Sequence, residues 1–381
     1  MSLIVDEHRE YLADEVRLAA LDAAIGATVR PGDVVLDLGA GTGILGLMAA
    51  RAGARHVYGL ECGIIVGLAR DVARANGFGD RFTFIQELST RAELPEPVDV
   101  IVTDSMGRFG FEAGLLEYLA DARRRFLKPG GRTVPVGVDL WAAPVTHAPQ
   151  WARVAFWESR PAGFDFSAAR SLAGGTGYPL RIEASDLLSE GRRIATLDLA
   201  ADEPGTVQGT IECPVTRGGI MHGVAGWFHA ELAPSIGFTN APTAACRINR
   251  RNVFFPLDRP VVVEPADRVR VTLRIRPVEM VVAWQVTIAG PGPDGAVKAA
   301  CRQSTFQGML VPASDVRRTD PASVPELSAA GRARRSILEL CDGRRPLGEI
   351  EAEVYRRHPD LFGSKAQAAV FVAEVITRYV V

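Results

Sequence analysis

The sequence has few of the features that mark secreted, membrane or metal-binding proteins. Its 381 residues include five scattered cysteines and no C-x-x-C pair, so neither a disulfide framework nor a zinc site is expected. No apolar run approaches the roughly 20 residues that cross a bilayer. The start Met1-Ser-Leu-Ile-Val-Asp-Glu is too short and too acidic for a signal peptide. We therefore expect a cytoplasmic protein with no membrane partner.

The sequence also lacks a large excess of either positive or negative charge. The net charge is −2, which gives no basic excess of the kind that binds nucleic acid. What remains is an ordinary globular composition, 47% hydrophobic and 23% charged. A chain of this length exceeds the usual size of one hydrophobic core, so two or three domains are expected.

The first third of the chain alternates short apolar runs with helical patterns. Val34–Leu38 is nearly continuous apolar sequence, as expected of a parallel strand covered on both faces. Further strands are predicted at 56–60, 82–85 and 98–102. Helical patterns cover 8–27, 44–52, 64–76 and 115–126. The alternation predicts an α/β fold, a doubly wound Rossmann-like parallel sheet, over residues 1–135.

Short β-type runs separated by glycine and proline take over from about residue 134. They are predicted at 134–145, 193–199, 206–213, 221–232, 261–264, 269–276 and 281–288. Strands at this spacing, without long helices between them, predict an antiparallel barrel or sandwich over residues 136–312. A mixed segment at 164–190 interrupts it.

The end of the chain has a third pattern. After a polar stretch at 312–325, residues 327–342 and 364–380 have helical patterns, and Pro346 opens a further helix between them. A hairpin is expected just ahead of these helices. We predict a small helical domain over residues 320–381.

A glycine-rich turn follows the first predicted strand and opens a helix. In Gly39-Ala40-Gly41-Thr-Gly43 the glycines let the backbone approach a ligand closely. A dinucleotide fingerprint would place its third glycine at position 44, where Ile44 stands. With Asp37 two residues ahead of the first glycine, the pattern is the E/D-x-G-x-G-x-G of methyltransferases. A plain packing turn is the alternative.

An acidic residue at the end of the second predicted strand supports a nucleoside ligand. Glu61 follows the turn by about 20 residues, where a carboxylate can accept hydrogen bonds from both ribose hydroxyls. Asp37 is expected to orient the loop and the methionyl amino group, or only to hold the turn. The expected cofactor is S-adenosyl-L-methionine.

Four stretches of the chain resemble the protein arginine methyltransferases. They are His8–Arg17, similar to that family's N-terminal lid helix; Val35–Leu45, similar to its glycine loop; Gly59–Cys62, similar to its ribose-binding strand end; and Gly219–Phe228 with Gly237–Pro242, similar to its barrel strands. The resemblance implies that residues 136–312 form a β-barrel. It also implies that the 164–190 segment is a dimerisation arm, which favours a homodimer.

The resemblance also implies roles for individual residues. Arg17 would pair with the methionyl carboxylate, with His8 beside it, and Glu61 would hold the ribose. Ser89 and Thr90 fall where the family contacts adenine, although a glutamate is usual at the second place. The expected cofactor-binding residues are His8, Arg17, Asp37, Gly39, Ala40, Gly41, Gly43, Glu61, Cys62, Ser89 and Thr90.

The acceptor loop departs from the family pattern. Arginine methylation needs two carboxylates around a planar guanidinium, which the family supplies from S-E-W-M-G-Y and a second glutamate. Here Asp104 replaces the first glutamate, and Ala113 stands at the second position beside Glu112. Arg108 replaces the usual tyrosine. The arginine clamp is therefore expected to be dismantled.

A second part of the acceptor pocket is altered as well. The family's Thr-His-Trp element is replaced by Arg247-Ile-Asn249. Asp104 and Glu112 remain the candidate catalytic carboxylates, because an amine acceptor must lose a proton on methylation. We expect Asp104 to have the acceptor-side role, or else only to cap the loop near the cofactor.

The C-terminal stretch Ser336–Ile350 resembles the small peptide-chaperone (PqqD-like) domain of pyrroloquinoline quinone biosynthesis. That domain, winged-helix-like in fold, recognises leader peptides in pathways that modify ribosomally made peptides. The resemblance implies that a precursor peptide with a leader is the partner, gripped by strand addition at the tail. Tethering would raise the effective concentration of the acceptor group. A generic helical cap or dimerisation tail is the alternative.

Three functions follow from these observations. The favoured one is methylation of a peptide amine, such as a terminal amine, in a precursor peptide. The second is arginine methylation, with Glu112 supplying the second carboxylate after a one-residue loop shift. The third is a non-catalytic peptide-binding scaffold, against which the complete cofactor motif argues.

Overall fold

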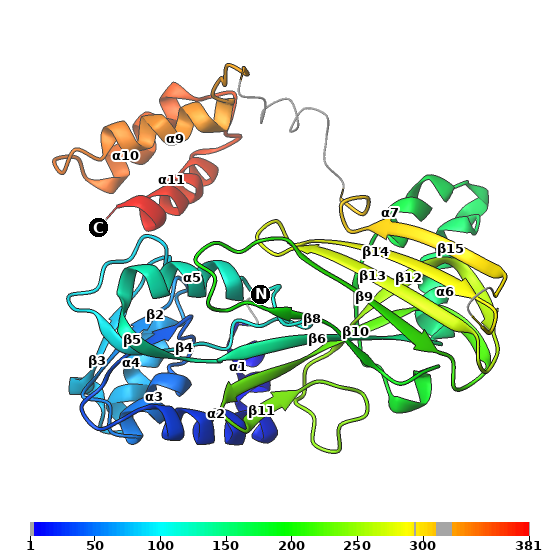
Figure 1. The fold of residues 1–381 in the computed structure, drawn as a ribbon. Coiled ribbons are helices and arrows are strands. Elements are labelled where there is room, and N and C mark those ends of the chain that lie inside the picture. Colours follow the sequence, from blue (N-terminus) through cyan, green and yellow to red (C-terminus); the bar gives the residue numbers. More distant parts are fainter. Residues whose placement is uncertain (1–3, 293–294, 310–321, 381) are drawn as a thin grey trace. The chain divides into compact units, whose positions relative to one another are not determined.

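A parallel sheet of five strands forms the N-terminal part of the computed structural model, which describes residues 4–292, 295–309 and 322–380 (Figure 1). The strand order is β3-β2-β1-β4-β5, and all pairings are parallel. The bounds are β1 Val34–Leu38, β2 His56–Leu60, β3 Phe82–Ile85, β4 Val98–Val102 and β5 Leu127–Val134. All five residues of the central β1 are buried. The predicted α/β, Rossmann-like sheet is confirmed.

Helices connect the strands of this sheet. They are α3 Ile44–Arg51, α4 Val66–Ala75 and α5 Leu115–Phe126, with a short 3₁₀ turn η1 at Gly79–Arg81. The helical pattern over 8–27 is divided into α1 Ile4–Leu12 and α2 Glu15–Thr28. The break occurs at Asp14, whose side chain accepts a hydrogen bond from the Arg17 amide at 3.1 Å and so caps α2.

Two antiparallel sheets follow the parallel one. The six-stranded sheet has the order β7-β12-β10-β6-β8, with β11 paired to β10, and the four-stranded sheet has the order β15-β14-β13-β9. Their bounds are β6 Gly137–Val145, β7 Tyr178–Leu180, β8 Arg192–Leu197, β9 Val207–Pro214, β10 Gly219–Ala233, β11 Ile236–Thr239, β12 Asn252–Val263, β13 Arg268–Arg276, β14 Val281–Ala289 and β15 Val297–Ser304. The strand pairings of the described residues give antiparallel sheets and do not close them into a ring.

Four strands were not predicted, and one begins earlier than predicted. β5 is an edge strand that contains Pro129, Gly130 and Gly131, which are residue types depleted in strands. β12 starts at Asn252 rather than near residue 261, because Pro256 and the charged pair after Leu257 interrupt its apolar pattern. β15 is an edge strand whose outer side chains are largely exposed, so it lacks the apolar alternation of a half-buried strand. β7 and β11 are too short to give a sequence pattern.

The segment between β6 and β8 is longer than the predicted 164–190. It begins with α6 Ala148–Ala155, continues through η2 Phe156–Glu158, η3 Pro161–Gly163, η4 Ser167–Ala169 and α7 Arg170–Gly174, and ends with β7 and η5 Ala184–Asp186. The His147 side chain caps α6 by accepting from the Gln150 amide at 3.1 Å. Three phenylalanines of this segment, Phe156, Phe164 and Phe166, are 49%, 68% and 44% exposed.

One hydrophobic core runs through the parallel sheet and both antiparallel sheets. Phe109, in the loop after β4, packs edge-on against Phe255 of β12 with ring centroids 5.8 Å apart. Phe255 packs against Trp284 of β14 at 5.0 Å. The loop that carries the candidate acceptor residues is therefore anchored in the antiparallel sheets.

The C-terminal residues form a separate compact unit, which is divided from the first between residues 309 and 310. It consists of α9 Ala329–Leu340, α10 Leu347–Arg357 and α11 Lys365–Tyr379. These helices have their own core, to which Ile337, Val354 and Val372 contribute fully buried side chains. The three predicted helices are confirmed. The hairpin expected just ahead of them falls largely on 310–321, outside the described residues.

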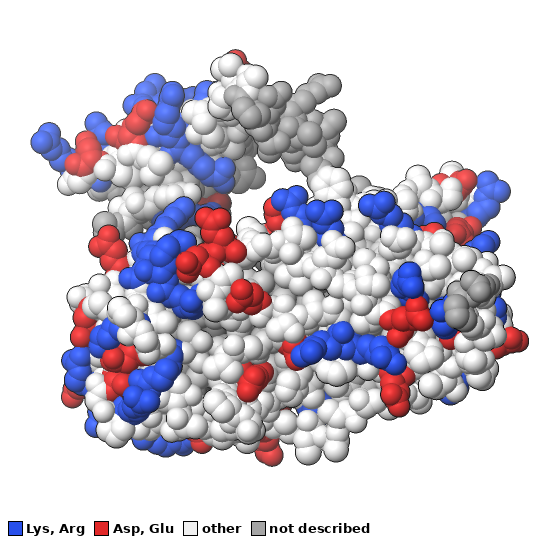
Figure 2. All heavy atoms as spheres, viewed as in Figure 1, with Lys and Arg blue, Asp and Glu red and all other residues white. Residues whose placement is uncertain are grey.

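The surface carries no segregated charge on the face shown in Figure 2, where acidic and basic side chains are interspersed over the first unit. Among the described residues, no helix has the length and apolarity that a membrane span requires.

Candidate cofactor and acceptor site

The glycine turn connects β1 to α3. Gly39, Gly41 and Gly43 have φ values of +75°, +54° and +81°, a region that side chains disfavour. A Cβ at Gly41 would lie 2.7 Å from Cε1 of His8, which belongs to α1. One at Gly39 would lie 3.3 Å from the Ser105 hydroxyl. A side chain at Gly41 would therefore collide with His8, and one at Gly39 would press against Ser105.

Asp37 lies buried at the end of β1, directly before this turn. Its Oδ2 accepts a hydrogen bond from the Gly46 amide of α3 at 2.8 Å. Its Oδ1 is buried and has no partner. Burial, with a further contribution from Glu61, raises the pKa of the Asp37 carboxyl to about 7. A buried acceptor without a donor is costly, so Oδ1 is suited to a donor group on a ligand.

Glu61 reaches across the turn from the end of β2. Its carboxylate accepts hydrogen bonds from the Gly41 amide at 2.9 Å and the Gly63 amide at 2.6 Å. The structure therefore brings together the two parts of the motif, which lie 20 positions apart in the sequence. Cys62 follows with an exposed thiol, and Ala40 is buried in the turn itself.

The loop after β3 carries Ser89 and Thr90. The Ser89 carbonyl accepts a hydrogen bond from Nη1 of Arg125 at 2.8 Å, and Nη2 of Arg125 also binds the Ala92 carbonyl. Thr90 is exposed. Sequence reasoning missed Arg125, although the three arginines that end α5 were a visible signal of cations near this loop.

Arg17 of α2 is buried and pairs with a protein carboxylate. Its Nε donates to Oδ2 of Asp104 at 2.5 Å, and its Nη1 donates to the Tyr11 carbonyl at 3.1 Å. The guanidinium lies 5.4 Å from the centre of the Tyr11 ring. His8 lies over Gly41 from α1, so His8 and Arg17 approach the turn and the acceptor loop from neighbouring helices.

Asp104 follows β4 and is paired with two arginines. Besides Arg17, Nη2 of Arg250 donates to its Oδ2 at 3.2 Å. Asp104 and Arg250 have side chains that are only 8% and 12% exposed. Arg250 also lies 5.8 Å from the centre of the Tyr11 ring. Sequence reasoning missed both Arg250 and Tyr11; Arg250 directly follows the altered Arg247–Asn249 element.

Glu112 is turned into its own loop. Its carboxylate accepts hydrogen bonds from the Phe109 amide at 2.8 Å and the Phe111 amide at 3.4 Å. Burial raises the pKa of the Glu112 carboxyl, although these backbone bonds oppose the rise. The structure therefore gives Asp104 and Glu112 different surroundings, and Glu112 acts here as a cap of the acceptor loop.

A buried asparagine connects the acceptor loop to the antiparallel sheet. The Nδ2 group of Asn240 donates to the carbonyls of Arg108 at 2.9 Å and Arg251 at 3.1 Å. Its Oδ1 accepts from the Phe228 amide at 3.0 Å. Asn240 thus joins the segment after Asp104, the segment after Arg250 and β10. Asn240 lies in the Gly237–Pro242 stretch that resembles the family, but it was not predicted as a site residue.

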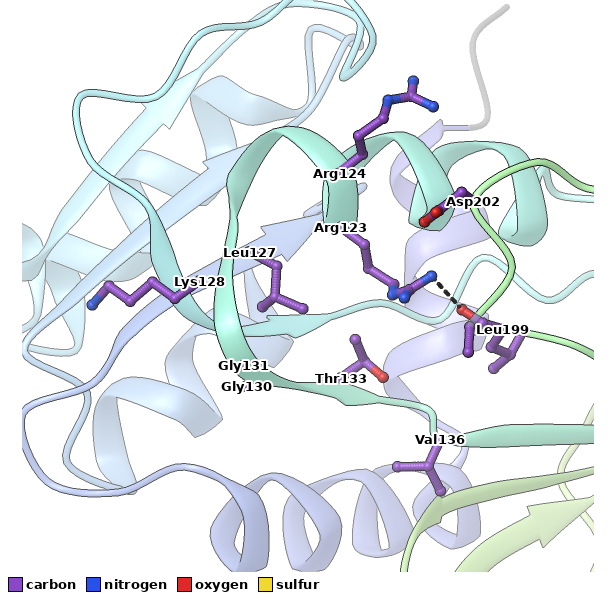
Figure 3. Close-up of a pocket in the computed structure, with 11 residues that line it drawn as sticks. Arg123, Arg124, Leu127, Lys128, Gly130, Gly131, Thr133, Val136, Leu199 and Asp202 are labelled. Carbon is purple, nitrogen blue, oxygen red and sulfur yellow. Dashed lines mark hydrogen bonds between the residues drawn. The ribbon is translucent and has the colours of Figure 1, made fainter.

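A separate hollow of about 350 Å³ lies between α5, β5 and the residues that follow β8 (Figure 3). Figure 3 shows Arg123 pointing at the Leu199 carbonyl, to which it donates at 3.1 Å. Lys128, another lining residue, is paired with Asp99 at 2.8 Å. Arg123 and Lys128, two cationic side chains that line the hollow, already bind protein groups, so we do not assign this hollow to the cofactor.

The residues around the turn fit a sulfonium nucleoside. The positive-φ glycines leave a surface that a Cβ would fill, Asp37 presents an unpartnered acceptor beneath it, and Glu61 lies at the neighbouring strand end. Among the described residues, no group of His, Cys, Asp and Glu side chains is arranged to hold a metal ion.

Comparison with known proteins identifies relatives over most of the first unit. Residues 138–286 match the family "Arginine methyltransferase oligomerization subdomain", and residues 15–138 match "Ribosomal protein L11 methyltransferase (PrmA)". Protein arginine N-methyltransferase 1 of Chlamydomonas reinhardtii is 31% identical over 257 residues, 65% of this chain and 74% of that protein. Protein arginine N-methyltransferase 6 of Danio rerio is 34% identical over 235 residues, 58% of this chain and 67% of that protein.

Solved structures show the same fold. A chain of the Trypanosoma brucei PRMT1 enzyme-prozyme heterotetrameric complex with AdoHcy superimposes with a TM-score of 0.68 at 22% identity, covering 78% of this chain and 97% of that one. Arabidopsis thaliana protein arginine methyltransferase 10 gives 0.67 at 21% identity, covering 78% and 96%. The chain belongs to the protein arginine methyltransferase family of S-adenosylmethionine-dependent enzymes.

Proposed function

We propose that the chain transfers a methyl group from S-adenosyl-L-methionine to an amine nitrogen of a peptide. The observation that carries this proposal is the state of the acceptor carboxylates. Asp104 is already matched by Arg17 and Arg250, Glu112 is turned into its loop, and Ala113 offers no carboxylate. A substrate guanidinium would meet the cations Arg17 and Arg250 here instead of two free carboxylates, so the site disfavours binding of an arginine side chain.

The cofactor-binding roles belong to this proposal. The amides and positive-φ glycines of 39–43 would line the cofactor, and Glu61 would accept the ribose hydroxyls. Asp37 Oδ1 would accept from the methionyl amino group, and Arg17 would be shared between Asp104 and the methionyl carboxylate. His8 would cover the turn from α1. Cys62 would border the ribose, and Ser89 and Thr90 the adenine.

The chemistry needs little from the protein beyond alignment and exclusion of water. The bound cofactor supplies a methyl carbon activated by a sulfonium. The acceptor nitrogen must present a free lone pair, so the amine has to be neutral when it is held. Asp104 can hold it by accepting one of its N–H groups and can take the proton released on methylation.

Arginine methylation is the second candidate, and the comparisons support it better than they support a terminal amine. The named relatives that match the chain are protein arginine N-methyltransferases. For this chain to act likewise, Glu112 would have to release the Phe109 and Phe111 amides and turn outward. Membership of an enzyme family counts against the third alternative, a non-catalytic scaffold.

We further propose that the C-terminal unit binds the leader of a precursor peptide. Its three helices have a core of their own, so it can act as a separate recognition module. Apolar side chains remain exposed on it: Leu338, Leu347 and Val370 are 45%, 47% and 71% exposed. Tethering of this kind would compensate for a weakly selective acceptor pocket. Because the described residues 322–380 contain helices only, contact with a helix face is the form of recognition that they support.

We also propose that the protein forms a homodimer through residues 136–312. The match to the oligomerization subdomain covers the segment between β6 and β8. That segment exposes Phe156, Phe164 and Phe166, and exposed aromatic clusters mark interaction surfaces. We also propose that the two antiparallel sheets together form the barrel of the family.

The mass of candidate substrates tests the proposed function. Purified protein is incubated with S-adenosylmethionine and two peptides of equal length, one with a free amino end and no arginine, the other N-acetylated with one arginine. The proposal predicts gains of 14 Da or its multiples, the mass of added CH₂, on the first peptide only. Gain on the arginine peptide alone would establish the second candidate instead.

A further inference from the structure

The ion pair between Asp104 and Arg250 leaves one hydrogen-bonding atom unused on each partner. Oδ2 of Asp104 receives both Arg17 and Arg250, whereas Oδ1 is buried and has no hydrogen-bond partner. Nη2 of Arg250 makes the contact, whereas Nη1 is buried and also has no partner. The pair thus presents one unused acceptor and one unused donor.

The two unused atoms belong to side chains that are joined through their other terminal atoms. Nη2 of Arg250 lies 3.2 Å from Oδ2 of Asp104, and Asp104 belongs to the loop that follows β4. Each buried polar atom without a partner destabilises the protein, because the atom has lost its hydrogen bonds to water. A ligand that supplied one donor and one acceptor would remove both costs.

The chemistry of the two atoms discriminates between amines. A guanidinium has five N–H donors and no acceptor, so it could satisfy Oδ1 of Asp104 but would leave Nη1 of Arg250 unpaired. A simple alkylamine also leaves Nη1 of Arg250 unpaired, because its only acceptor, the nitrogen lone pair, has to point at the methyl group. An amine with a neighbouring carbonyl supplies both an N–H for Asp104 and an oxygen for Arg250.

We infer that the acceptor is an amine whose own chain carries a carbonyl oxygen one or two carbons away, as at the free amino end of a peptide, and that Arg250 selects it by donating to that carbonyl. The inference rests on the proposed function and names its substrate class. In the transfer, the nitrogen–carbon bond forms as the sulfur–carbon bond breaks, and the nitrogen then loses a proton to Asp104 or water. Arg250 holds the acceptor and takes no part in bond making.

Binding of two small probes tests the inference without turnover. The dissociation constants of alaninamide and of 2-aminobutane, which has the same skeleton without the carbonyl, are measured with S-adenosylhomocysteine present. The ratio of the two constants is compared among variants, because differences in amine basicity then cancel. Arg250→Met should reduce the preference for alaninamide at least about 10-fold, the effect of losing one charged hydrogen bond.

Two further variants make the result specific. Arg250→Lys keeps an ion pair with Asp104 but has no second nitrogen for the carbonyl, so it should lose the preference as well. Arg251→Met is the matched control, because Arg251 is the neighbouring arginine and its side chain is exposed; its ratio should equal that of the wild type. Unchanged affinity for S-adenosylhomocysteine shows that each variant is folded.

An unchanged ratio in both Arg250 variants would overturn the inference. Intact-mass measurement on the same proteins separates it from the proposed function. Methylation of a peptide amine without an Arg250-dependent ratio removes the inference alone. An Arg250-dependent ratio without methylation of any peptide amine removes the proposed function and leaves the role of Arg250 standing.

Discussion

At the scale of single residues, the surroundings of a carboxylate decide what it can do. Asp104 and Glu112 lie eight positions apart in one loop, and the sequence offered both as catalytic groups. The structure gives Asp104 two arginine partners and gives Glu112 two backbone amides. Their roles should therefore be separable by substitution.

Glu112→Gln should affect stability more than catalysis. The amide side chain keeps the shape and one acceptor for the Phe109 amide but loses the charge, so we expect a loss of about 1 kcal/mol in the free energy of unfolding. Methyl-transfer rates should change less than about threefold, whereas Asp104→Asn should lower them at least about 100-fold, an acid–base-sized effect. Loss of activity in Glu112→Gln equal to that in Asp104→Asn would contradict this assignment.

Asp37 should make stability depend on pH. The folded protein holds the Asp37 proton up to about pH 7, whereas the unfolded chain releases it near pH 4. Folding stability should therefore fall as the pH rises from about 4 to about 7 and then level off. Asp37→Asn removes this titration, so the stability of the wild type relative to the variant should fall by about 3 kcal/mol between pH 5 and 8. Urea unfolding at both pH values measures it, and parallel pH profiles would refute it.

At the scale of elements, the sequence predicted what periodicity and glycine spacing encode. The four strands β1 to β4 and the helices α3 to α5 were found within two residues, because each combines a long enough apolar pattern with a clear end. The start of β12, the edge strand β15 and the segment before residue 164 were missed. Those elements depend on partners distant in sequence, which no local pattern reveals.

The residues of the candidate site also divide into those that a sequence motif predicts and those that it does not. The glycine turn, Asp37 and Glu61 carry a motif and could be predicted. Arg250 lies in no motif, and Tyr11, although it lies in the His8–Arg17 stretch, was not predicted as a site residue. Their relation to Asp104 exists only after α1, α2 and the segment before β12 have come together. Asn240 is a similar case, since it connects three segments by side-chain bonds.

Asn240→Ala tests whether that connection positions the acceptor loop. The variant loses three hydrogen bonds to backbone groups, so we expect a loss of about 2–3 kcal/mol in stability. Because the loop after β4 is loosened, kcat/KM for the peptide should fall about 10-fold while affinity for S-adenosylhomocysteine stays unchanged. Asn76→Ala, an exposed asparagine at the end of α4, is the control. A parallel loss of cofactor affinity would show that Asn240 supports the whole site.

At the scale of the whole molecule, the two compact units should have separate tasks. A chain ending at residue 309 retains the entire core of the first unit. It should bind S-adenosylhomocysteine as the full chain does and methylate small amines at the same rate. With a precursor peptide, KM should rise at least about 100-fold, the range that tethering supplies. An unchanged KM for the peptide would remove the proposed role of the C-terminal unit.

The assembly can be tested at the same scale. Phe164→Asp together with Phe166→Asp places charges on the exposed aromatic surface between β6 and β8. If this surface is the dimer contact, light scattering should show twice the 40.9 kDa chain mass for the wild type and a single chain mass for the variant. A wild-type protein of one chain mass would remove the proposed homodimer.

The glycine turn is the feature on which every other assignment depends, and calorimetry with S-adenosylhomocysteine tests it most directly. Gly41→Ala adds a methyl group at φ +54° facing His8, whereas Gly77→Ala adds one at φ +77° with no atom within 4 Å. Gly77→Ala should cost about 1 kcal/mol of stability, and Gly41→Ala at least as much, because the His8 side chain has to move. The account predicts that the wild type and Gly77→Ala bind one S-adenosylhomocysteine per chain with equal affinity, and that Gly41→Ala binds it at least about 10-fold more weakly. Equal affinity in all three proteins, or no binding by the wild type, would contradict it.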